Sequence, residues 1–365
     1  MKRCLSLLLG LLCLTACQKT PSGEEPQPDP SPAPESPAVP AFARGADVSW
    51  LSEMEHDGKT FKKKDGTAAD LFTVLKDCGV DAIRLRVWVN PTGGWSGKED
   101  MVALAVRANQ AGLPVMVDFH YSDFFADPSR QTIPADWKAD QGDLNKLCAH
   151  VAAHTTEVLT ALYDAGVAPA WVQVGNETRN GMLWPAGQLW DSKGDIADGY
   201  THFARLYMAG YSAVKALFPK ALVMPHLNNA YEDNAWWFQK VQAAGATFDA
   251  IALSHYPQAE SKYTAGEYNQ KAVAQIKALN SRFHLPVIVS EVGVKAARTD
   301  AASVLKDFVD ALRDLEGCAG VFYWEPEVYG YWKPAVYNSL GWNAYDQGAF
   351  AADGRPLAIM DAFNH

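Results

Sequence analysis

The amino-acid sequence predicts a single (β/α)8 barrel, the TIM-barrel architecture. From Gly45 onward, short apolar runs alternate with helical patterns, and eight such units fit within the 365 residues. Gly-Val or Gly-Leu pairs recur just before several of the apolar runs, as expected where a helix ends and a strand begins. A doubly wound open sheet is the structural alternative, and it is weakened because no Gly-rich phosphate loop follows the first strand.

The eight predicted strands are short and mainly apolar, and most of them end in polar residues. They cover residues 45–50, 81–89, 114–120, 171–175, 221–226, 249–256, 286–291 and 320–325. Helical patterns cover residues 68–77, 99–111, 144–165 and 302–312. Because functional residues of a barrel collect at the C-terminal ends of its strands, the polar residues there are candidates for a site. They include Asp47, Arg84, Arg86, Asp118, His120, Asp123, Asn176, Glu177, His226, Asn228, His255, Tyr256, Glu291 and Glu325.

Tryptophans are concentrated near the same strand ends. Trp88 and Trp324 lie in the strands, and six more follow in the loops: Trp95, Trp137, Trp184, Trp190, Trp332 and Trp342. Core packing would place most tryptophans on helix faces and in strand middles. The distribution therefore predicts an aromatic cleft on which sugars stack.

Two glutamates have the positions that glycoside hydrolysis requires. Glu177 ends the fourth predicted strand and Glu291 ends the seventh, so their side chains converge across the barrel mouth. One carboxylic acid must protonate the leaving oxygen, and a second carboxylate must attack the anomeric carbon or activate water. The Asn176 amide precedes Glu177 and is placed to bind a sugar hydroxyl beside the reacting carbon. The alternative is that both glutamates form salt bridges with barrel arginines.

The proton positions of this pair can also be predicted. Arg84 and Arg86 lie two residues apart and share one face of the second strand. One of them is expected to hold Glu291 ionised, because a nearby cation lowers the pKa of a carboxyl group. The pKa of Glu177 is expected to be raised by the neighbouring Glu291, which would keep Glu177 protonated before reaction.

Charge and histidine spacing exclude other classes of site. The formal net charge of -10 argues against nucleic acid as a partner and is compatible with a neutral ligand. His120, His226 and His255 show neither H-x-x-x-H nor H-x-H spacing, so no catalytic metal is predicted.

The N-terminal residues predict export and lipid anchoring. Residues 1–16 combine a basic start with an apolar run too short to span a bilayer, as in a lipoprotein signal peptide. The last residues of this segment and Cys17 resemble a bacterial lipobox, so Cys17 is expected to be acylated and to anchor the protein to the outer membrane, at the cell surface or on the periplasmic face. An ordinary secretion signal with a chance Cys is the alternative. Residues 17–43 are rich in Pro, Ser and Glu and are predicted to be a disordered tether, with the catalytic barrel in residues 44–365.

Three cysteines remain in the predicted barrel, which is too few for a complete disulfide framework. They are Cys78, Cys148 and Cys318. Each lies in or beside an apolar stretch, so all three are expected to be buried free thiols.

Five stretches in order resemble the motifs of glycoside hydrolase family 53. They are GADVSW, IRLRVWVNP, VDFHYSDFFADPSRQTIPADW, VGNETRNGMLWP and FYWEP, and the resemblance runs from about Gly45 to the C-terminus. It implies a clan A barrel and an endo-β-1,4-galactanase that acts on type I (arabino)galactan. It further implies a retaining double displacement with Glu177 as acid/base and Glu291 as nucleophile. In such a site the two carboxyl groups lie about 5 to 5.5 Å apart.

The resemblance also implies substrate-binding residues around the cleaved bond. Those nearest to it would be Arg84, His120, Asn176, Tyr256 and Trp324. Asp123, Trp137 and Trp184 match family motifs in the loops. Asp47, Trp88, His226 and Asn228 complete the predicted set of substrate contacts from the strand ends.

One departure from the family concerns calcium. Some bacterial relatives hold a structural calcium between long loops after strands seven and eight. Here the chain passes from Glu291 into the helix near Ala302 within a few residues, and this loop is poor in acidic ligands. We therefore expect no calcium and no other cofactor.

Two other functions remain open from the sequence. Another clan A endo-β-1,4-glycanase, a mannanase or glucanase, would use the same two glutamates, and only the loop motifs argue against it. A non-catalytic glycan-binding surface lipoprotein would keep the aromatic cleft, but binding alone does not need both Glu177 and Glu291. A barrel on a long tether needs no partner subunit, so we expect a monomer whose partners are β-1,4-galactan and the membrane.

Overall fold

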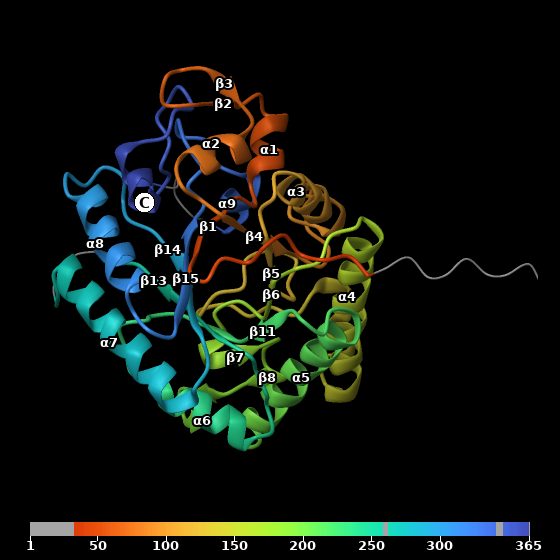
Figure 1. Ribbon diagram of the computed structural model, residues 1–365. Helices are drawn as coiled ribbons and strands as arrows, with labels where there is room; N and C mark the ends of the chain where they lie inside the picture. Colours follow the sequence, from red (N-terminus) through yellow and green to blue (C-terminus); the bar gives the residue numbers. More distant parts are fainter. Residues whose placement is uncertain (1–32, 258–261, 341–345, 365) are drawn as a thin grey trace, which may run out of the picture. The chain divides into compact units, whose positions relative to one another are not determined.

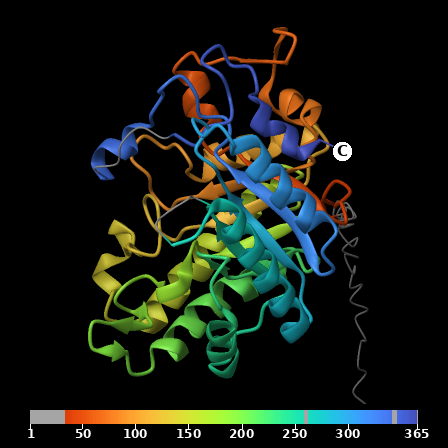
Figure 2. The ribbon, with the colours of Figure 1, turned by 90° about the vertical axis from the view of Figure 1, so that its left-hand side faces the viewer.

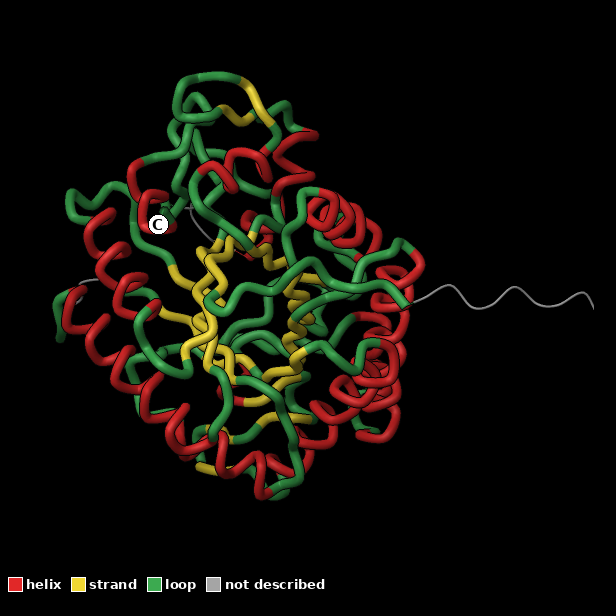
Figure 3. The backbone as a smooth tube through the Cα atoms, viewed as in Figure 1, coloured by secondary structure: helices red, strands yellow, loops and turns green. Residues whose placement is uncertain are grey.

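The computed structural model describes residues 33–257, 262–340 and 346–364. Parallel strands lie at its centre and helices surround them (Figures 1 and 3). The barrel strands are β1 (Ala43–Asp47), β4 (Ala82–Val87), β5 (Val115–Phe119), β6 (Trp171–Val174), β11 (Leu222–Met224), β12 (His226–Leu227), β13 (Ile251–His255), β14 (Val287–Val292) and β15 (Cys318–Trp324). Each coincides with one of the eight predicted strands, except that two of these segments divide the fifth.

The sheet closes into a barrel through its fifth strand. The strand order is β11-β6-β5-β4-β1-β15-β14-β13-β12, so β11 and β12 stand at the two ends of the order. Only Pro225 separates these two segments in sequence, and its ring removes the N–H that the ladder would use. The Pro225 carbonyl still accepts the N–H of Ala252 at 3.1 Å, on the β13 side. The ring of eight strands is therefore continuous, and the predicted fold class is confirmed.

Helices follow the strands along the chain. They are α1 (Leu51–His56), α2 (Leu71–Asp77), α3 (Lys98–Gln110), α4 (Leu144–Asp164), α5 (Gly199–Leu217), α6 (Ala235–Ala243), α7 (Ala265–Phe283), α8 (Ala301–Arg313) and α9 (Ala335–Leu340), with 3-10 turns η1 (Ala135–Asp140), η2 (Thr178–Asn180) and η3 (Ala358–Phe363). The start of α7 shows how sequence sets a boundary. Thr264 accepts the N–H of Glu267 and Glu267 accepts that of Thr264, a capping box that satisfies two otherwise unpaired donors.

Three two-stranded sheets lie in the loops outside the barrel. They are β2 (Phe61–Lys62) with β3 (Ala68–Ala69), β7 (Gly181–Met182) with β8 (Gly187–Gln188), and β9 (Trp190–Asp191) with β10 (Gly194–Asp195). The β2–β3 pair lies beside α1 and α2 at the top of Figures 1 and 2. Its presence corrects one prediction, because the helix expected from residue 68 begins only at Leu71.

The first strand also differs from its prediction. It covers Ala43–Asp47 and therefore begins at the last residue of the predicted tether and ends before Trp50. The backbone turns away after Asp47 because that side chain accepts hydrogen bonds from the N–H and hydroxyl of Ser49, at 3.1 and 2.5 Å. The N–H of Trp50 then donates to Glu327 at 3.2 Å, which starts α1.

The barrel interior is filled at the N-terminal end of the strands. Trp171 and Phe322 meet there edge to face, with ring centroids 5.8 Å apart, among small and apolar residues of the other strands. Gly45 makes room for this plug, because a Cβ at that position would lie 1.9 Å from the ring of Phe322. Within the described residues, the ring thus leaves space for a site at the C-terminal end of its strands.

The remaining fold-level predictions concern cysteines and the membrane. Cys78, Cys148 and Cys318 are free thiols, with Cys78 and Cys318 buried and Cys148 only half-buried. The predicted signal peptide and Cys17 lie outside the described residues. None of the helices in residues 33–257, 262–340 and 346–364 is long and apolar enough to cross a membrane.

Candidate active site

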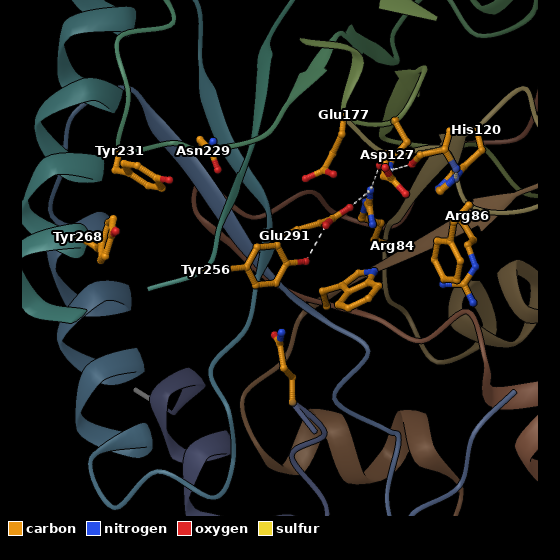
Figure 4. Close-up of a pocket in the computed structure, with 15 residues that line it drawn as sticks. Arg84, Arg86, His120, Asp127, Glu177, Asn229, Tyr231, Tyr256, Tyr268 and Glu291 are labelled. Carbon is orange, nitrogen blue, oxygen red and sulfur yellow. Dashed lines mark hydrogen bonds and ion pairs between the residues drawn. The ribbon is translucent and has the colours of Figure 1, made fainter. Parts of the chain in front are cut away.

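A cavity of about 380 Å³ opens at the C-terminal ends of the strands (Figure 4). Eight of the candidate site residues line it: Arg84, Arg86, His120, Asn176, Glu177, Tyr256, Glu291 and Trp324. They come from six different strands or strand ends, so the closed ring of strands is what brings them together.

Arg84 is the centre of the polar network beneath the cavity. Its Nη1 donates to Asp47 at 2.6 Å, and its Nη2 donates to Asp118 and Glu291, each at 2.8 Å. Nη2 also lies 3.1 Å from Oδ1 of Asn176, and Nε donates to Gln173 at 2.7 Å. Such a planar donor fork satisfies several buried carboxylates at once, which a lysine cannot do.

Both carboxylate oxygens of Glu291 accept hydrogen bonds. Oε1 accepts from Arg84 and Oε2 accepts from the hydroxyl of Tyr256 at 2.7 Å. The pairing register shifts on both sides of β14 near this residue, between Leu253 and Ser254 on β13 and between Val289 and Val292 on β14 itself. Irregularities of this kind re-aim a side chain, here into the cavity.

The pKa of Glu291 reflects two opposing effects. Burial raises it above the ordinary value, while Arg84 and the Tyr256 hydroxyl lower it. The expected arginine contact is therefore present and comes from Arg84, but burial outweighs it in the net direction of the shift.

Glu177 lies in a different environment. Glu177 lies three residues after Val174, the last residue of β6. Its backbone is in the left-handed conformation, with φ 45°, and this turns the chain sharply away from the strand. Burial first and the neighbouring Glu291 second raise the pKa of Glu177 to about 8, while a hydrogen bond with Ser254 acts in the opposite direction. The predicted direction is the one found, although burial rather than Glu291 is the larger cause.

The Asn176 side chain is fixed by its neighbours. Its Nδ2 donates to the carbonyl of Ala126 at 2.8 Å, which turns Oδ1 toward Arg84 and toward Nδ1 of His226 at 2.9 Å. His226 also lies 2.8 Å from the hydroxyl of Ser254 through Nε2. Burial and then Arg84 hold the pKa of His226 well below its ordinary value, so the ring is neutral.

Contacts at both ring nitrogens fix the orientation of His120. Its Nδ1 accepts the N–H of Ala126 at 3.0 Å, so Nε2 carries the proton and faces Asp118 at 2.9 Å. Burial alone would raise the pKa of Asp118, but Arg84 and His120 outweigh it and bring the pKa to about 2. Asp118 is thus an ionised anchor for the two side chains that face the cavity.

Arg86, the other candidate partner of Glu291, pairs elsewhere. Its Nη1 donates to Glu325 at 2.5 Å, and its guanidinium lies over the rings of Trp50 and Phe125, at 3.9 and 4.8 Å from their centroids. It lines the cavity from behind Phe125 but makes its ion pair away from Glu291.

Three predicted substrate contacts lie behind the cavity wall. Asp47 and His226 are completely buried and act on Arg84 and Asn176. Trp88 is 2% exposed and packs edge to face on Phe125, with centroids 5.2 Å apart. These placements correct the expected sugar contacts, because buried side chains of this layer can only position those in front of them.

Three more predicted contacts lie in loops outside the cavity. Asp123 accepts the N–H groups of Asn90 and Ala135 at 3.1 and 2.8 Å and so fixes the backbone of its loop. Trp184 donates its indole N–H to the carbonyl of Asn180 at 2.8 Å. Asn228 does not line the cavity, whereas the next residue along the chain does.

The loop tryptophans that were expected to form a stacking cleft lie outside this cavity. None of the five in the described residues lines the cavity: Trp95, Trp137, Trp184, Trp190 and Trp332. Trp137 is 6% exposed and stacks on His150, and Trp332 is 8% exposed with its indole N–H bonded to Asp57 at 2.8 Å. Trp137 and Trp332 are therefore buried by their own loops, whereas Trp95, Trp184 and Trp190 are half-buried. Trp342 lies outside the described residues.

Seven cavity residues were missed from the sequence. They are Phe125, Ala126, Asp127, Asn229, Tyr231, Tyr268 and Gln347. The first three lie inside a motif that resembles the family, which was a usable signal. The others lie in loops or on α7, where nothing in the sequence pattern distinguishes a cavity residue from any other surface residue. In the part of the chain that the structure describes, no group of three His, Cys, Asp or Glu side chains is arranged to hold a metal.

Known proteins share both the sequence and this architecture. Residues 43–301 match the family described as Glycosyl hydrolase family 53. A protein of Thermothelomyces thermophilus named arabinogalactan endo-beta-1,4-galactanase is 31% identical over 345 residues, which are 88% of this chain and 98% of that protein. A solved structure of one of two fungal beta-1,4-galactanases has a TM-score of 0.76 at 28% identity, covering 89% of this chain and all 100% of the other. The GH53 catalytic domain of Ignisphaera aggregans gives the same TM-score and identity, 0.76 and 28%, over 92% of this chain and 99% of that one. The chain belongs to glycosyl hydrolase family 53.

Proposed function

We propose that this protein is an endo-acting, retaining β-1,4-galactanase that cleaves type I (arabino)galactan of pectin. The observation that carries the proposal is the contrast between two glutamates that line one cavity, the half-buried Glu177 and the buried Glu291. Glu177 has its pKa raised to about 8 by burial, while Glu291 is bonded to Arg84 and Tyr256. One group is suited to donate a proton and the other to attack as a carboxylate.

In the first step, Glu177 donates its proton to the glycosidic oxygen as the bond to the anomeric carbon breaks. An oxygen of Glu291 attacks that carbon and forms a glycosyl ester, and the electron pair of the broken bond stays on the leaving sugar. Arg84 and the Tyr256 hydroxyl keep the Glu291 carboxylate oriented for this attack.

In the second step, Glu177 acts as a base. Ester formation removes the negative charge of Glu291, which is the second cause of the raised pKa of Glu177. The pKa of Glu177 therefore falls, and its carboxylate takes a proton from the water that attacks the anomeric carbon. The ester bond breaks, Glu291 is restored, and the configuration of the sugar is retained.

The substrate class is tested by reducing-sugar release. The parent protein and Glu291→Gln are each incubated with linear β-1,4-galactan, β-mannan and β-glucan. We expect release from galactan alone, and its loss in the variant. Release from mannan or glucan instead would replace the substrate with that of another clan A glycanase. No release from any glycan, together with retained binding, would support the binding lipoprotein.

The roles of the two glutamates are tested by azide rescue. Glu291→Ala supplied with azide is expected to give an α-galactosyl azide, because azide attacks directly from the vacated face. Glu177→Ala is expected to give a β-galactosyl azide, because azide replaces water on the glycosyl ester. NMR of the products distinguishes them, and the same anomer from both variants would contradict double displacement.

We also propose that Cys17 is acylated and holds the barrel at the bacterial outer membrane. The support is the basic start, the short apolar run and the small residues before Cys17. Cys17→Ser is expected to move the enzyme from the membrane fraction to the soluble fraction. Equal membrane association of both proteins would contradict the anchor.

We propose further that the barrel acts as a monomer without a cofactor. Analytical ultracentrifugation of the barrel, and activity after dialysis against EDTA, are the measurements. A dimer at micromolar concentration, or activity restored only by added calcium, would contradict this proposal.

A further inference from the structure

The cavity has two chemically different ends. In Figure 4, His120 and Arg86 lie on one side of the glutamate pair, and Asn229, Tyr231 and Tyr268 lie on the other. At the first end, His120 faces Asp118 of the Arg84 network, and Arg86 is held by its ion pair with Glu325. The second end is made of aromatic rings and an amide, the composition expected of a surface that binds sugar rings.

We infer that Tyr231 and Tyr268 form the wall that binds the leaving sugar, the first galactose released on the side of the protonated oxygen. The inference rests on the proposed function. An endo-acting enzyme must hold sugars on both sides of the cleaved bond. The reacting sugar must lie where its anomeric carbon reaches Glu291, next to Arg84. The sugar that receives the proton of Glu177 then occupies the tyrosine end.

The rings of this wall support one another. Tyr231 and Tyr268 meet edge to face with centroids 4.7 Å apart, and Tyr263 packs on the outer side of Tyr268 at 5.2 Å. Tyr268 is 7% exposed and backs the more accessible Tyr231. The axial O4 of β-galactose leaves three C–H groups on one face of the sugar, and such a face packs on an aromatic ring.

The wall is also fixed relative to the proton donor. Arg179, two residues after Glu177, pairs with Glu232 at 2.7 Å and donates to Oδ1 of Asn234 at 2.6 Å. Nδ2 of Asn234 in turn donates to the carbonyl of Asn229 at 3.1 Å. The loop that carries Tyr231 and the turn that carries Glu177 are therefore one hydrogen-bonded unit. A leaving sugar that binds to the loop of Tyr231 is therefore held close to the carboxyl group of Glu177.

Two substrates separate the leaving-sugar wall from the rest of the site. β-1,4-Galactotetraose places galactose on both sides of the cleaved bond. β-Galactobiosyl fluoride places none on the leaving side, and fluoride departs without a proton. The variants are Tyr231→Ala and Tyr231→Phe, with Tyr200→Ala on α5 as the matched control for loss of a half-buried tyrosine ring.

We expect Tyr231→Ala to lower kcat/KM for galactotetraose by roughly tenfold or more while fluoride release from galactobiosyl fluoride stays within about twofold. Tyr231→Phe is expected to keep most of the activity, because the ring makes the contact. Transfer of the galactosyl ester to added galactobiose, which must bind the same wall, should fall in parallel with cleavage of the tetraose.

Three results would overturn the inference. Equal loss on both substrates would assign the wall to the reacting sugar or to folding, and Tyr200→Ala with circular dichroism identifies the latter. No loss on either substrate would place the leaving sugar elsewhere. A Tyr231→Phe variant as impaired as Tyr231→Ala would replace ring stacking with a hydroxyl contact. Failure of the proposed function would be seen separately, as a parent protein that cleaves neither substrate.

Discussion

Two arginines of β4 are equally buried, but one is surrounded by polar side chains and the other by aromatic rings. Arg84 and Arg86 are each 1% exposed and lie two residues apart on one strand. Arg84 donates to five polar side chains and lies directly beneath the glutamate pair. Arg86 donates to Glu325 and Ser96, and aromatic rings cover its faces.

The difference is clearest in the carboxyl groups around each arginine. Beside Arg84, Asp118 has its pKa lowered to about 2, because Arg84 and His120 outweigh the effect of burial. Beside Arg86, burial raises the pKa of Glu325 to about 7 even though the arginine acts against it. Burial and then Glu325 hold the pKa of Glu327 well above its ordinary value. Asp118 of the first cluster therefore stays charged, whereas burial favours the protonated form of Glu325 and Glu327 in the second.

Removing each arginine tests this comparison most strongly. Arg84→Met is expected to lower kcat/KM by roughly a thousandfold or more, since Glu291 loses its cation, and to destabilise the fold by about 3 kcal/mol through unpaired buried carboxylates. Arg86→Met should give a similar loss of stability with a much smaller loss of kcat/KM, because its ion pair lies away from the glutamates. Steady-state kinetics and urea unfolding are the measurements. Equal kinetic losses would show that both clusters serve catalysis.

The pH dependence of stability should differ in direction between Asp118, beside Arg84, and Glu325, beside Arg86. The pKa of Glu325 is about 7 in the fold against an ordinary 4.5, so its contribution is fully present below pH 4.5 and is lost, by roughly 3 kcal/mol, as pH rises through 7. The pKa of Asp118 is about 2 against an ordinary 3.8, so its contribution is present above pH 3.8 and is lost as pH falls toward 2. Urea unfolding across pH is the measurement. Glu325→Gln should reduce the pH dependence of the free energy of unfolding only in the upper pH range, and Asp118→Asn only in the lower one. The opposite result, in which each variant changes the other range, would contradict the assignment.

The hydroxyl of Tyr256 gives a smaller and more local test. It lowers the pKa of Glu291, so Tyr256→Phe should raise that pKa further and move the acid limb of the kcat/KM profile to higher pH. The alkaline limb, set by Glu177 near pH 8 in the free enzyme, should stay. We expect kcat/KM at the optimum to fall about tenfold.

The control for this test is Tyr121→Phe. It removes a buried hydroxyl bonded to Thr155 at 2.7 Å, outside the cavity. It should change neither limb. If Tyr256→Phe moves the alkaline limb instead, the hydroxyl acts on Glu177 and the assigned roles of the glutamates are reversed.

The sequence predicted the fold well because the barrel strands follow a repeating pattern. Errors arose where a single side chain overrides the pattern. Asp47 turns the chain after β1 by binding Ser49, and Pro225 divides the fifth strand. Hydrophobic periodicity shows neither effect, because the first is a local hydrogen bond of a polar side chain and the second is the missing N–H of a proline.

Most of the cavity residues expected from the sequence lie at strand ends, whereas most of those that it missed lie in loops. Glu177 and Glu291 sit on strands whose positions the barrel fixes. Tyr231 and Tyr268 reach the cavity only because long-range contacts, such as that of Arg179 with Glu232, place their loop and helix. Trp137 was expected in the cleft, but the interior of a long loop buries its ring.

The smallest expected change in stability is that of Glu327→Gln, and its comparison with Asp118→Asn tests whether the two arginine clusters differ in charge. Glu327 is completely buried and accepts the N–H of Trp50 through Oε1. Because burial and then Glu325 raise the pKa of Glu327 well above its ordinary value, the fold favours the protonated carboxyl, and Glu327→Gln should change the free energy of unfolding by less than about 1 kcal/mol. Asp118→Asn at the same pH removes a real charge from Arg84 and should destabilise by roughly 2 kcal/mol. Urea unfolding of both variants at pH 7 measures the difference. If Glu327→Gln is as damaging as Asp118→Asn, then Glu327 is ionised in the fold, and Arg86 balances two carboxylates much as Arg84 does.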